Sequence, residues 1–237
     1  MNILIIPDVH QTGGWKYAVA NYYNDYDYII QVGDWFDTHD PNFDWEANDP
    51  IANFRSALKT TKEYPKFKIC FGNHDFSYLL KSHCSNFQWD HYKEIRDVLI
   101  EAVPYVNIAY EVDGWVISHA GFTKTWMKDN GFETIEQVNE AFHEMNFDIF
   151  QFCGWNIYGD DPSNGPCWVR PASLYRDAYF KYQVVGHTPV ENAPLHLDCK
   201  GEIMKVLKPS IEGQKIILID NDKHDIIFSL DTVEDKK

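Results

Sequence analysis

The chain has few cysteines, few basic residues and no long apolar run, and each shortage excludes a class of protein. Its 5 cysteines, among 237 residues, are scattered without the paired spacing of a zinc knuckle or a disulfide framework, so reduced, mostly buried thiols are expected. No apolar run approaches the length that spans a membrane, and the start Met1-Asn2-Ile3-Leu4 lacks the cationic stretch and cleavage site of a secretory signal. We therefore expect a cytoplasmic protein with no membrane partner.

Basic residues are outnumbered by acidic ones, 21 to 36, which gives a formal net charge of -15. A field of this sign repels polyanions, so long nucleic acid is disfavoured as a partner. The 44% of hydrophobic residues can bury a large core, and no shift in composition marks a second domain. We predict a single domain over residues 1–230 and a frayed tail over 231–237. The sequence leaves the oligomeric state open.

Alternating apolar and helix-like segments predict an α/β protein. Asp113-Gly114 lies between apolar segments and predicts a hairpin, so the sheet is expected to be mixed. Thr134 and Gln137 predict a capping box for the second of two helices within 123–146. Strands are expected at 2–7, 27–32, 67–71, 105–111, 115–118, 182–185, 203–207, 215–220 and 225–230, helices at about 13–24 and 50–63, and a long loop at 154–171.

Short polar segments follow several predicted strands. They are Asp8-Val9-His10, Gly33-Asp34-Trp35-Phe36-Asp37, Gly72-Asn73-His74-Asp75, Ser118-His119-Ala120-Gly121 and Gly186-His187-Thr188-Pro189. Loops at the carboxyl ends of strands hold ligands in open sheets, so we expect these segments to converge on one site. Six of their residues provide oxygen or nitrogen donors, enough for two cations if one carboxylate bridges them: Asp8, His10, Asp34, Asn73, His119 and His187.

The order of these segments resembles the calcineurin-like metallophosphoesterases over about residues 1–220. The resemblance implies a four-layer α-β-β-α sandwich with mixed sheets and a dinuclear centre in which a metal-bound hydroxide attacks phosphorus. By this resemblance, Asp8, His10 and Asp34 bind the first ion, and Asp34, Asn73, His119 and His187 bind the second. The two divalent ions are expected to be manganese, with iron, zinc or nickel as alternatives. The resemblance also implies that His74 is the general acid and that Asp37 pairs with it.

Each of these residues also has a simpler interpretation. The six donors could be satisfied polar residues at strand ends, although their joint pattern argues against this. His74 could be a structural loop histidine, and Asp37 could cap the following turn. His39, close behind the second segment, is a candidate for touching substrate. Trp and Tyr residues near 155–175 could form a base-stacking wall or could simply pack in the core.

The last segment reads Gly-His-Thr-Pro, without the second histidine of many phosphodiesterases, so it resembles the branch of protein Ser/Thr phosphatases and diadenosine tetraphosphatases. That branch generally has an arginine where this chain has Thr38. Arg170 resembles a second phosphate-holding arginine of the branch; its alternative is a salt bridge within the loop, and Arg176 is a weaker substitute.

The expected activity is hydrolysis of a phosphomonoester on a small molecule, a nucleotide or a phosphoprotein. Two alternatives remain from the sequence. The enzyme could cleave a dinucleoside polyphosphate or a cyclic nucleotide, which Thr38 leaves open. The chain could also be a phosphoesterase-like scaffold that binds a partner without catalysis, although the retained donor set and His74 speak against it.

Overall fold

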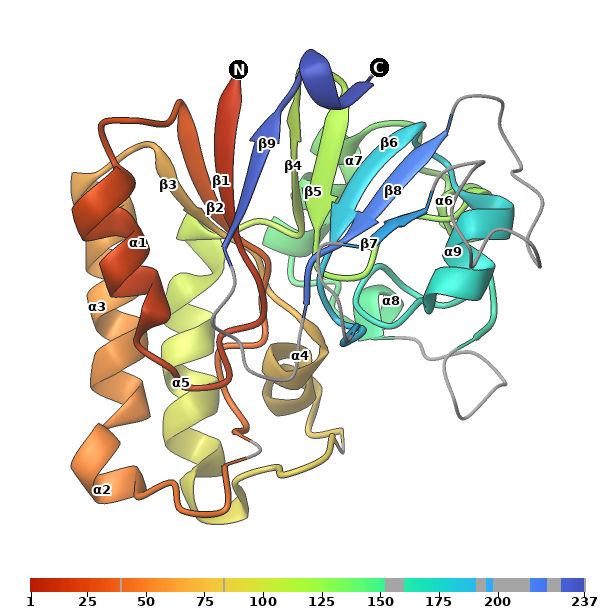
Figure 1. The fold of residues 1–237 in the computed structure, drawn as a ribbon. Helices are drawn as coiled ribbons and strands as arrows, with labels where there is room; N and C mark the ends of the chain where they lie inside the picture. The colour runs from red at the N-terminus through yellow and green to blue at the C-terminus, as the bar shows by residue number, and fades with distance from the viewer. Residues whose placement is uncertain are drawn as a thin grey trace.

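Two β-sheets lie between layers of helices in this computed structural model (Figure 1). The structure describes residues 1–38, 40–82, 84–151, 160–190, 195–197, 214–220 and 227–236. The first sheet has the order β3-β2-β1-β9 and the second has the order β4-β5-β6-β8-β7. Their strands are β1 (Asn2–Ile6), β2 (Tyr28–Gln31), β3 (Phe67–Ile69), β4 (Ala109–Val112), β5 (Trp115–Ser118), β6 (Tyr182–Val185), β7 (Leu195–Leu197), β8 (Lys215–Leu218) and β9 (Phe228–Asp231).

Both sheets have a parallel centre and an antiparallel edge. In the first, β1 pairs in parallel with β2 and β2 with β3, whereas β9 runs antiparallel to β1. In the second, β5, β6 and β8 are parallel, and the edge strands β4 and β7 are antiparallel to their neighbours. The hairpin predicted at Asp113-Gly114 joins β4 to β5. The predicted mixed α/β sandwich of four layers is confirmed.

The alternation of side chains along the strands builds the layers. Ile3 and Ile5 of β1 point between the sheets and pack with Trp115 and Ile117 of β5, while the intervening Leu4 belongs to the core under the helices. Apolar residues on both faces of the same strand are typical of sheets covered on both sides. The second sheet follows the same rule, with Ile217 and Ile219 facing the first sheet and Ile216 and Leu218 facing α9 (Pro171–Asp177).

Helices cover the outer faces of the sheets. In Figure 1, α1, α3 and α5 lie along one side, and α6 to α9 lie toward the other. Asp49 caps α3, and Pro50 occupies its first turn. The predicted capping box of Thr134 and Gln137 is confirmed at the start of α7. The helices are α1 (Gly14–Tyr22), α2 (Trp45–Asn48), α3 (Pro50–Glu63), α4 (Asn73–Leu80), α5 (Tyr92–Ala102), α6 (Lys124–Asp129), α7 (Ile135–His143), α8 (Asp148–Gln151) and α9 (Pro171–Asp177), with 3-10 turns at Trp89–His91, Val103–Tyr105 and Glu234–Lys236.

Several segments differ from the sequence expectations or lie beyond the description. Helix α4 starts within the segment expected to be a loop, because the Asp75 carboxylate accepts a hydrogen bond from the Gly72 N–H and caps the helix. Strand β7 was not predicted. The strand expected at 203–207 and residues 154–159 of the loop expected at 154–171 fall outside the described residues.

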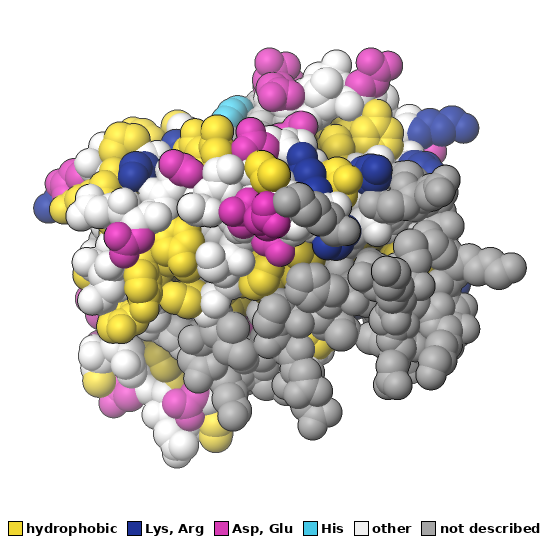
Figure 2. All heavy atoms as spheres, turned by 45° about the horizontal axis from the view of Figure 1, so that its top comes forward, with side chains coloured by type: hydrophobic (Ala, Val, Ile, Leu, Met, Phe, Trp, Pro, Cys, Tyr) yellow, Lys and Arg dark blue, Asp and Glu magenta, His cyan; other side chains and the backbone are white. Residues whose placement is uncertain are grey.

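The end of the sheets that carries both termini lies opposite the strand-end loops of β1, β2 and β3 (Figure 1). Figure 2 looks toward that end and shows Asp, Glu, Lys and Arg side chains interspersed with apolar ones. Residues 231–236, expected as a frayed tail, end β9 and form a short 3-10 turn, in which Lys236 donates a hydrogen bond to the carbonyl of Asp113. No helix in the described part of the chain is long and apolar enough to cross a membrane.

Candidate metal centre

The polar segments after β1, β2, β3 and β6 meet in one cavity of about 460 Å³. Parallel strands end at the same edge of a sheet, which brings loops distant in sequence side by side. The cavity is lined by Asp8, His10, Asp34, Asn73, His74, Cys84, Ser85, Trp168, Arg170, His187, Pro189 and Asp220. His119 lies just beneath it, fully buried against Asn73 and His187.

The backbone in these loops adopts conformations that L-residues rarely take. Positive φ angles occur at His10 (42°), Asp34 (52°), Asp37 (67°) and His187 (63°). Such conformations cost about 1–3 kcal/mol each and cluster at functional sites, where the surrounding structure enforces them. Gly33, with φ of 116°, lets the second loop approach the third so closely that a side chain there would collide with the backbone of Gly72.

Around His119, the lone pair of one ring nitrogen points at two acceptor oxygens. The His119 Nδ1 lies 3.1 Å from the carbonyl of Val32, which can only accept, so this nitrogen donates its proton and Nε2 carries a lone pair. That Nε2 faces Asn73 Oδ1 at 2.9 Å, His187 Nδ1 at 3.1 Å and Asp34 Oδ2 at 3.4 Å. Burial is the main cause that lowers the pKa of both His119 and His187 well below the ordinary value, so both rings are neutral. Converging lone pairs repel unless a cation lies between them.

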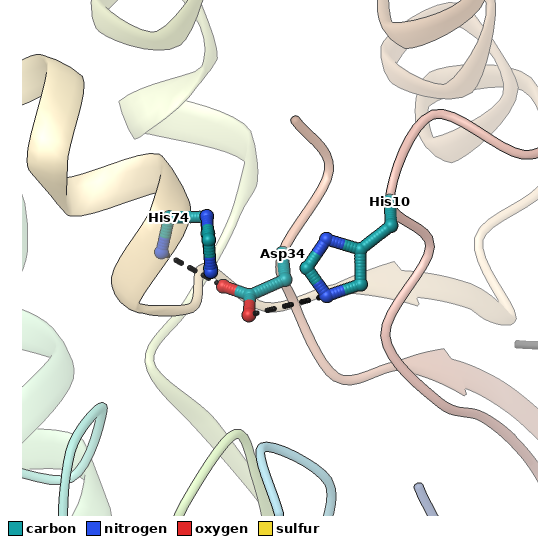
Figure 3. A group of neighbouring side chains, drawn as sticks. All are labelled: His10, Asp34 and His74. Carbon is teal, nitrogen blue, oxygen red and sulfur yellow. Dashed lines mark hydrogen bonds and ion pairs between the residues drawn. The ribbon is translucent and has the colours of Figure 1, made fainter. Parts of the chain in front are cut away.

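The second donor group lies around His10. Its Nδ1 is 2.7 Å from the carbonyl of Asp37, so that nitrogen donates, and its Nε2 lies 3.8 Å from Asp34 Oδ2. Figure 3 shows Asp34 between His10 and His74, with Oδ1 accepting the backbone N–H of His74 at 2.9 Å. His10, Asp34 and His74 form one group of metal-ligand spacing, and Asp34, His119 and His187 form another. Asp34 is the residue that the two groups share.

The carboxylates of the cavity are buried beside one another. Burial, followed by the charges of Asp220 and Asp34, raises the pKa of Asp8 well above its ordinary value. Burial, followed by the charge of Asp75, raises the pKa of Asp34 in the same way. Without a cation these groups would bind protons, and divalent ions would keep them ionised. The set of buried carboxylate, amide and neutral imidazole donors therefore fits divalent metal ions.

His74 and Asp37, expected to pair, are hydrogen-bonded in the structure. His74 Nδ1 donates to Asp37 Oδ2 at 2.9 Å, and the Asp37 side chain is fully buried. The neighbouring Asp75 has a structural position, because its two oxygens accept the N–H groups of Trp35 and Gly72, each at 2.9 Å. Asp75 thus ties the second polar segment to the third.

Arg170 reaches the cavity from the loop before α9. Its Nη1 donates to the carbonyl of His187 at 3.2 Å and to Thr188 Oγ1 at 3.1 Å, and no ion pair of this residue occurs among the described residues. The salt bridge in this region belongs to Arg176, which pairs with Asp160 at 3.8 Å and is exposed. Thr38 has an uncharged side chain, and His39 lies outside the described residues.

Sequence reasoning missed three residues at the site. Asp220 follows β8 and lines the cavity, and the run Ile-Ile-Leu-Ile before it is the same signal that singled out Asp8. Cys84 touches the Asn73 amide, with its Sγ 3.4 Å from Nδ2. Tyr78 donates a hydrogen bond to Asp37 Oδ1. No pattern in the sequence marks the last two, because only the fold brings them to their partners. Trp168, one of the aromatic residues considered as a stacking wall, lines the cavity and contacts the ring of His187 edge-on.

Comparison with known proteins gives one family and a fold likeness. A family model described as calcineurin-like phosphoesterase matches residues 1–191. No curated protein matches the chain at a significant level. Among solved structures, the cold-active protein-tyrosine phosphatase of a psychrophile Shewanella species is similar, with a TM-score of 0.60 at 15% sequence identity. The match covers 97% of this chain and 75% of that chain. A single-residue variant of a cold-active protein tyrosine phosphatase gives the same values. A metallophosphoesterase from Sphaerobacter thermophilus has a TM-score of 0.44 at 16% identity, covering 92% of this chain and 75% of that chain.

The structural similarity and the family match show different things. At 15% identity the phosphatase structures show the shared fold. The family model extends over residues 1–191 and includes the segments that carry His119 and His187. The chain therefore belongs to the calcineurin-like phosphoesterase family and is a phosphoric ester hydrolase that uses divalent metal ions.

Proposed function

We propose that this enzyme hydrolyses phosphomonoesters at a dinuclear metal centre in which Asp34 is the shared ligand. The observation that carries the proposal is that ring nitrogens of His10 on one side, and of His119 and His187 on the other, lie at metal-ligand spacing from Asp34. One ion would be held by Asp8, His10 and Asp34, and the other by Asp34, Asn73, His119 and His187. When bound, such ions supply Lewis-acid polarisation of the phosphoryl group and activation of water.

Backbone groups hold three of the proposed ligands in orientations suited to this role. The carbonyl of Val32 holds His119 in the tautomer whose lone pair is on Nε2, and the carbonyl of Asp37 does the same for His10. The backbone N–H of His187 donates to both oxygens of Asp8, at 3.2 and 3.1 Å, and fixes that carboxylate. Fixed ligands lose little conformational entropy on binding, which strengthens the site.

His74 is proposed as the general acid. Its Nδ1 proton is held by Asp37, which favours the protonated ring and sets its orientation at the cavity wall. As the bond between phosphorus and the leaving oxygen breaks, that oxygen takes the bond's electron pair and a proton from His74. The ring becomes neutral, and Asp37 stays ionised.

Arg170 is proposed to bind the phosphate. Its guanidinium lies at the cavity with one nitrogen anchored on the His187 loop, and a planar fork can hold two phosphoryl oxygens at once. Because Thr38 stands where related phosphatases generally have an arginine, Arg170 would provide the main protein cation of the substrate site.

Several finer features belong to the same proposal. We propose manganese as the metal that supports turnover, because mixed nitrogen and oxygen donors suit it. We propose a phosphorylated small molecule, a nucleotide or a phosphoprotein as substrate. The free, buried thiols of Cys70, Cys84 and Cys167 support a reducing compartment such as the cytoplasm.

A substrate panel with manganese tests this function. We expect phosphomonoesters to give the highest kcat/KM, above cyclic nucleotides and diadenosine polyphosphates. We expect His74→Asn to retain its metal but to lose about two to four orders of magnitude in kcat on an alkyl phosphate, the usual range for a general acid. A preference for the dinucleoside or cyclic substrates would replace the monoester proposal. Full activity of the His74→Asn enzyme on the alkyl phosphate would contradict the role of His74.

A further inference from the structure

A buried tyrosine stands behind the acid pair. The Tyr78 hydroxyl donates to Asp37 Oδ1, while Asp37 Oδ2 accepts from His74 Nδ1. The same hydroxyl oxygen accepts the backbone N–H of Gln88 at 2.8 Å. A continuous chain of hydrogen bonds therefore runs from Gln88 through Tyr78 and Asp37 to His74.

The position of Tyr78 is rigid. It lies on α4, one turn after His74, and its side chain has an exposed fraction of 0%. Its ring stacks on Phe87 with centroids 4.2 Å apart and meets Phe36 edge-on at 6.0 Å. Because the ring is packed and the oxygen is held by Gln88, the hydroxyl has little freedom to leave Asp37.

The hydroxyl remains a donor under all ordinary conditions. Burial and the charge of Asp37 raise the pKa of Tyr78 far above its usual range, so the phenol stays protonated. A buried carboxylate needs donors for both oxygens, and Tyr78 and His74 supply one each. Removal of the tyrosine donor would take away one of the hydrogen bonds that fix the orientation of Asp37 toward His74.

We propose that Tyr78 is a positioning residue for proton transfer, holding Asp37 so that His74 is aimed at the leaving oxygen. This inference rests on the proposed role of His74 as general acid. In the described part of the chain, Tyr78 is not among the residues that line the cavity, so it acts through Asp37 and not on the substrate. Its contribution should appear only where the leaving group requires a proton.

The test compares two leaving groups. A p-nitrophenyl ester releases a stabilised phenolate and needs little proton transfer, whereas an alkyl phosphate would release a strongly basic alkoxide and depends on the acid. We expect Tyr78→Phe to lower kcat on the alkyl phosphate by about tenfold or more, the usual effect of losing a hydrogen bond to a charged group. We expect KM for both substrates and kcat for the p-nitrophenyl ester to stay within about twofold of wild type.

The ratio of the two kcat values is the decisive quantity. Both rates come from one preparation, so a misfolded fraction cancels. Tyr110→Phe is the matched control, since it removes another internal tyrosine hydroxyl, which donates to the carbonyl of Ile69 at 3.2 Å. This control should leave the ratio unchanged. If Tyr78→Phe does not fold, Gln88→Pro removes the N–H that holds the hydroxyl, at a residue whose φ of -85° is close to that of proline. It should lower the same ratio to a smaller extent.

A double-mutant cycle separates this inference from the proposed function. In the His74→Asn enzyme, adding Tyr78→Phe should change neither rate further, because the acid is already gone. If His74→Asn fails to lower the alkyl rate selectively, the proposed acid is wrong. If His74→Asn lowers it selectively but Tyr78→Phe and Gln88→Pro leave the ratio unchanged, the inference about Tyr78 alone is overturned. Equal loss on both substrates in the Tyr78→Phe enzyme would also overturn it.

Discussion

Gly72 lies where any side chain would displace two proposed metal ligands. A Cβ atom built on Gly72 would be 2.2 Å from Asp34 Oδ1 and 2.7 Å from Cε1 and Nδ1 of His119. The backbone of Gly72, with φ of -114° and ψ of -174°, is acceptable for alanine, so the effect of Gly72→Ala comes from these contacts alone. Both ligands must move, because contacts of a Cβ below 3.0 Å are essentially never seen.

The size of the effect follows from these distances. Asp34 has to retreat by about 1 Å, and a displacement of that size at a catalytic group can cost about a hundredfold in rate. The added methyl group should lower the free energy of unfolding by about 1–3 kcal/mol, which corresponds to a melting temperature lower by roughly 2–12 °C for a domain of this length. Because Asp34 is the proposed shared ligand, affinity for both ions should fall.

Metal titration and thermal unfolding measure these effects. We expect the Gly72→Ala protein to bind manganese more weakly at both sites and to gain less in melting temperature when manganese is added. Gly14→Ala is the matched control, since a Cβ there meets nothing within 4 Å, and it should bind metal like wild type. Wild-type manganese affinity in the Gly72→Ala protein would refute the placement of Asp34 and His119 at the metals.

Three further predictions follow from other contacts of the site. Cys84→Ala removes a hydrogen-bond partner of the Asn73 amide and should weaken manganese binding about 10–100-fold, whereas Cys84→Ser should weaken it less. Isothermal titration measures both affinities, and equal values would argue against this role. Arg170→Lys keeps the charge but loses the fork, so KM for a phosphomonoester should rise about tenfold in steady-state assays, and an unchanged KM would exclude phosphate binding. Burial raises the pKa values of Asp8 and Asp34 above 3.8, so the metal-free folded protein binds protons more tightly than the unfolded chain and loses stability as pH rises toward those raised values. The gain in melting temperature on adding manganese should therefore be larger at pH 8 than at pH 5. A smaller gain at pH 8 would contradict this expectation.

The sequence predicts the parts of this protein that depend on local pattern. Short runs of Ile, Val and Leu indicate buried strands, and the polar residues after these runs stand at the carboxyl ends of the strands. That rule alone predicts that Asp8, Asp34, His119 and His187 lie at one edge, and the strand ends confirm it. The same rule, applied to the run that ends at Ile219, would have included Asp220.

Contacts made across the fold leave no such pattern. Tyr78 looks like any apolar helix residue, and its role depends on the left-handed turn at Asp37 that points the carboxylate toward α4. Cys84 reaches Asn73 only because the chain turns back after α4. The start of α4 could not be predicted from the sequence either, because Gly, Asn and Asp are typical of loops. The helix begins there because the Asp75 side chain accepts a hydrogen bond from the Gly72 N–H and caps it.

Metal content measured together with activity tests the dinuclear centre most directly. After exhaustive dialysis against a chelator, the chain should hold no metal and hydrolyse no phosphate ester. Stepwise addition of manganese should restore hydrolysis, with activity rising to its plateau at two ions per chain. Full hydrolysis by the metal-free protein, or a plateau at one ion per chain, would contradict the shared-ligand site built around Asp34.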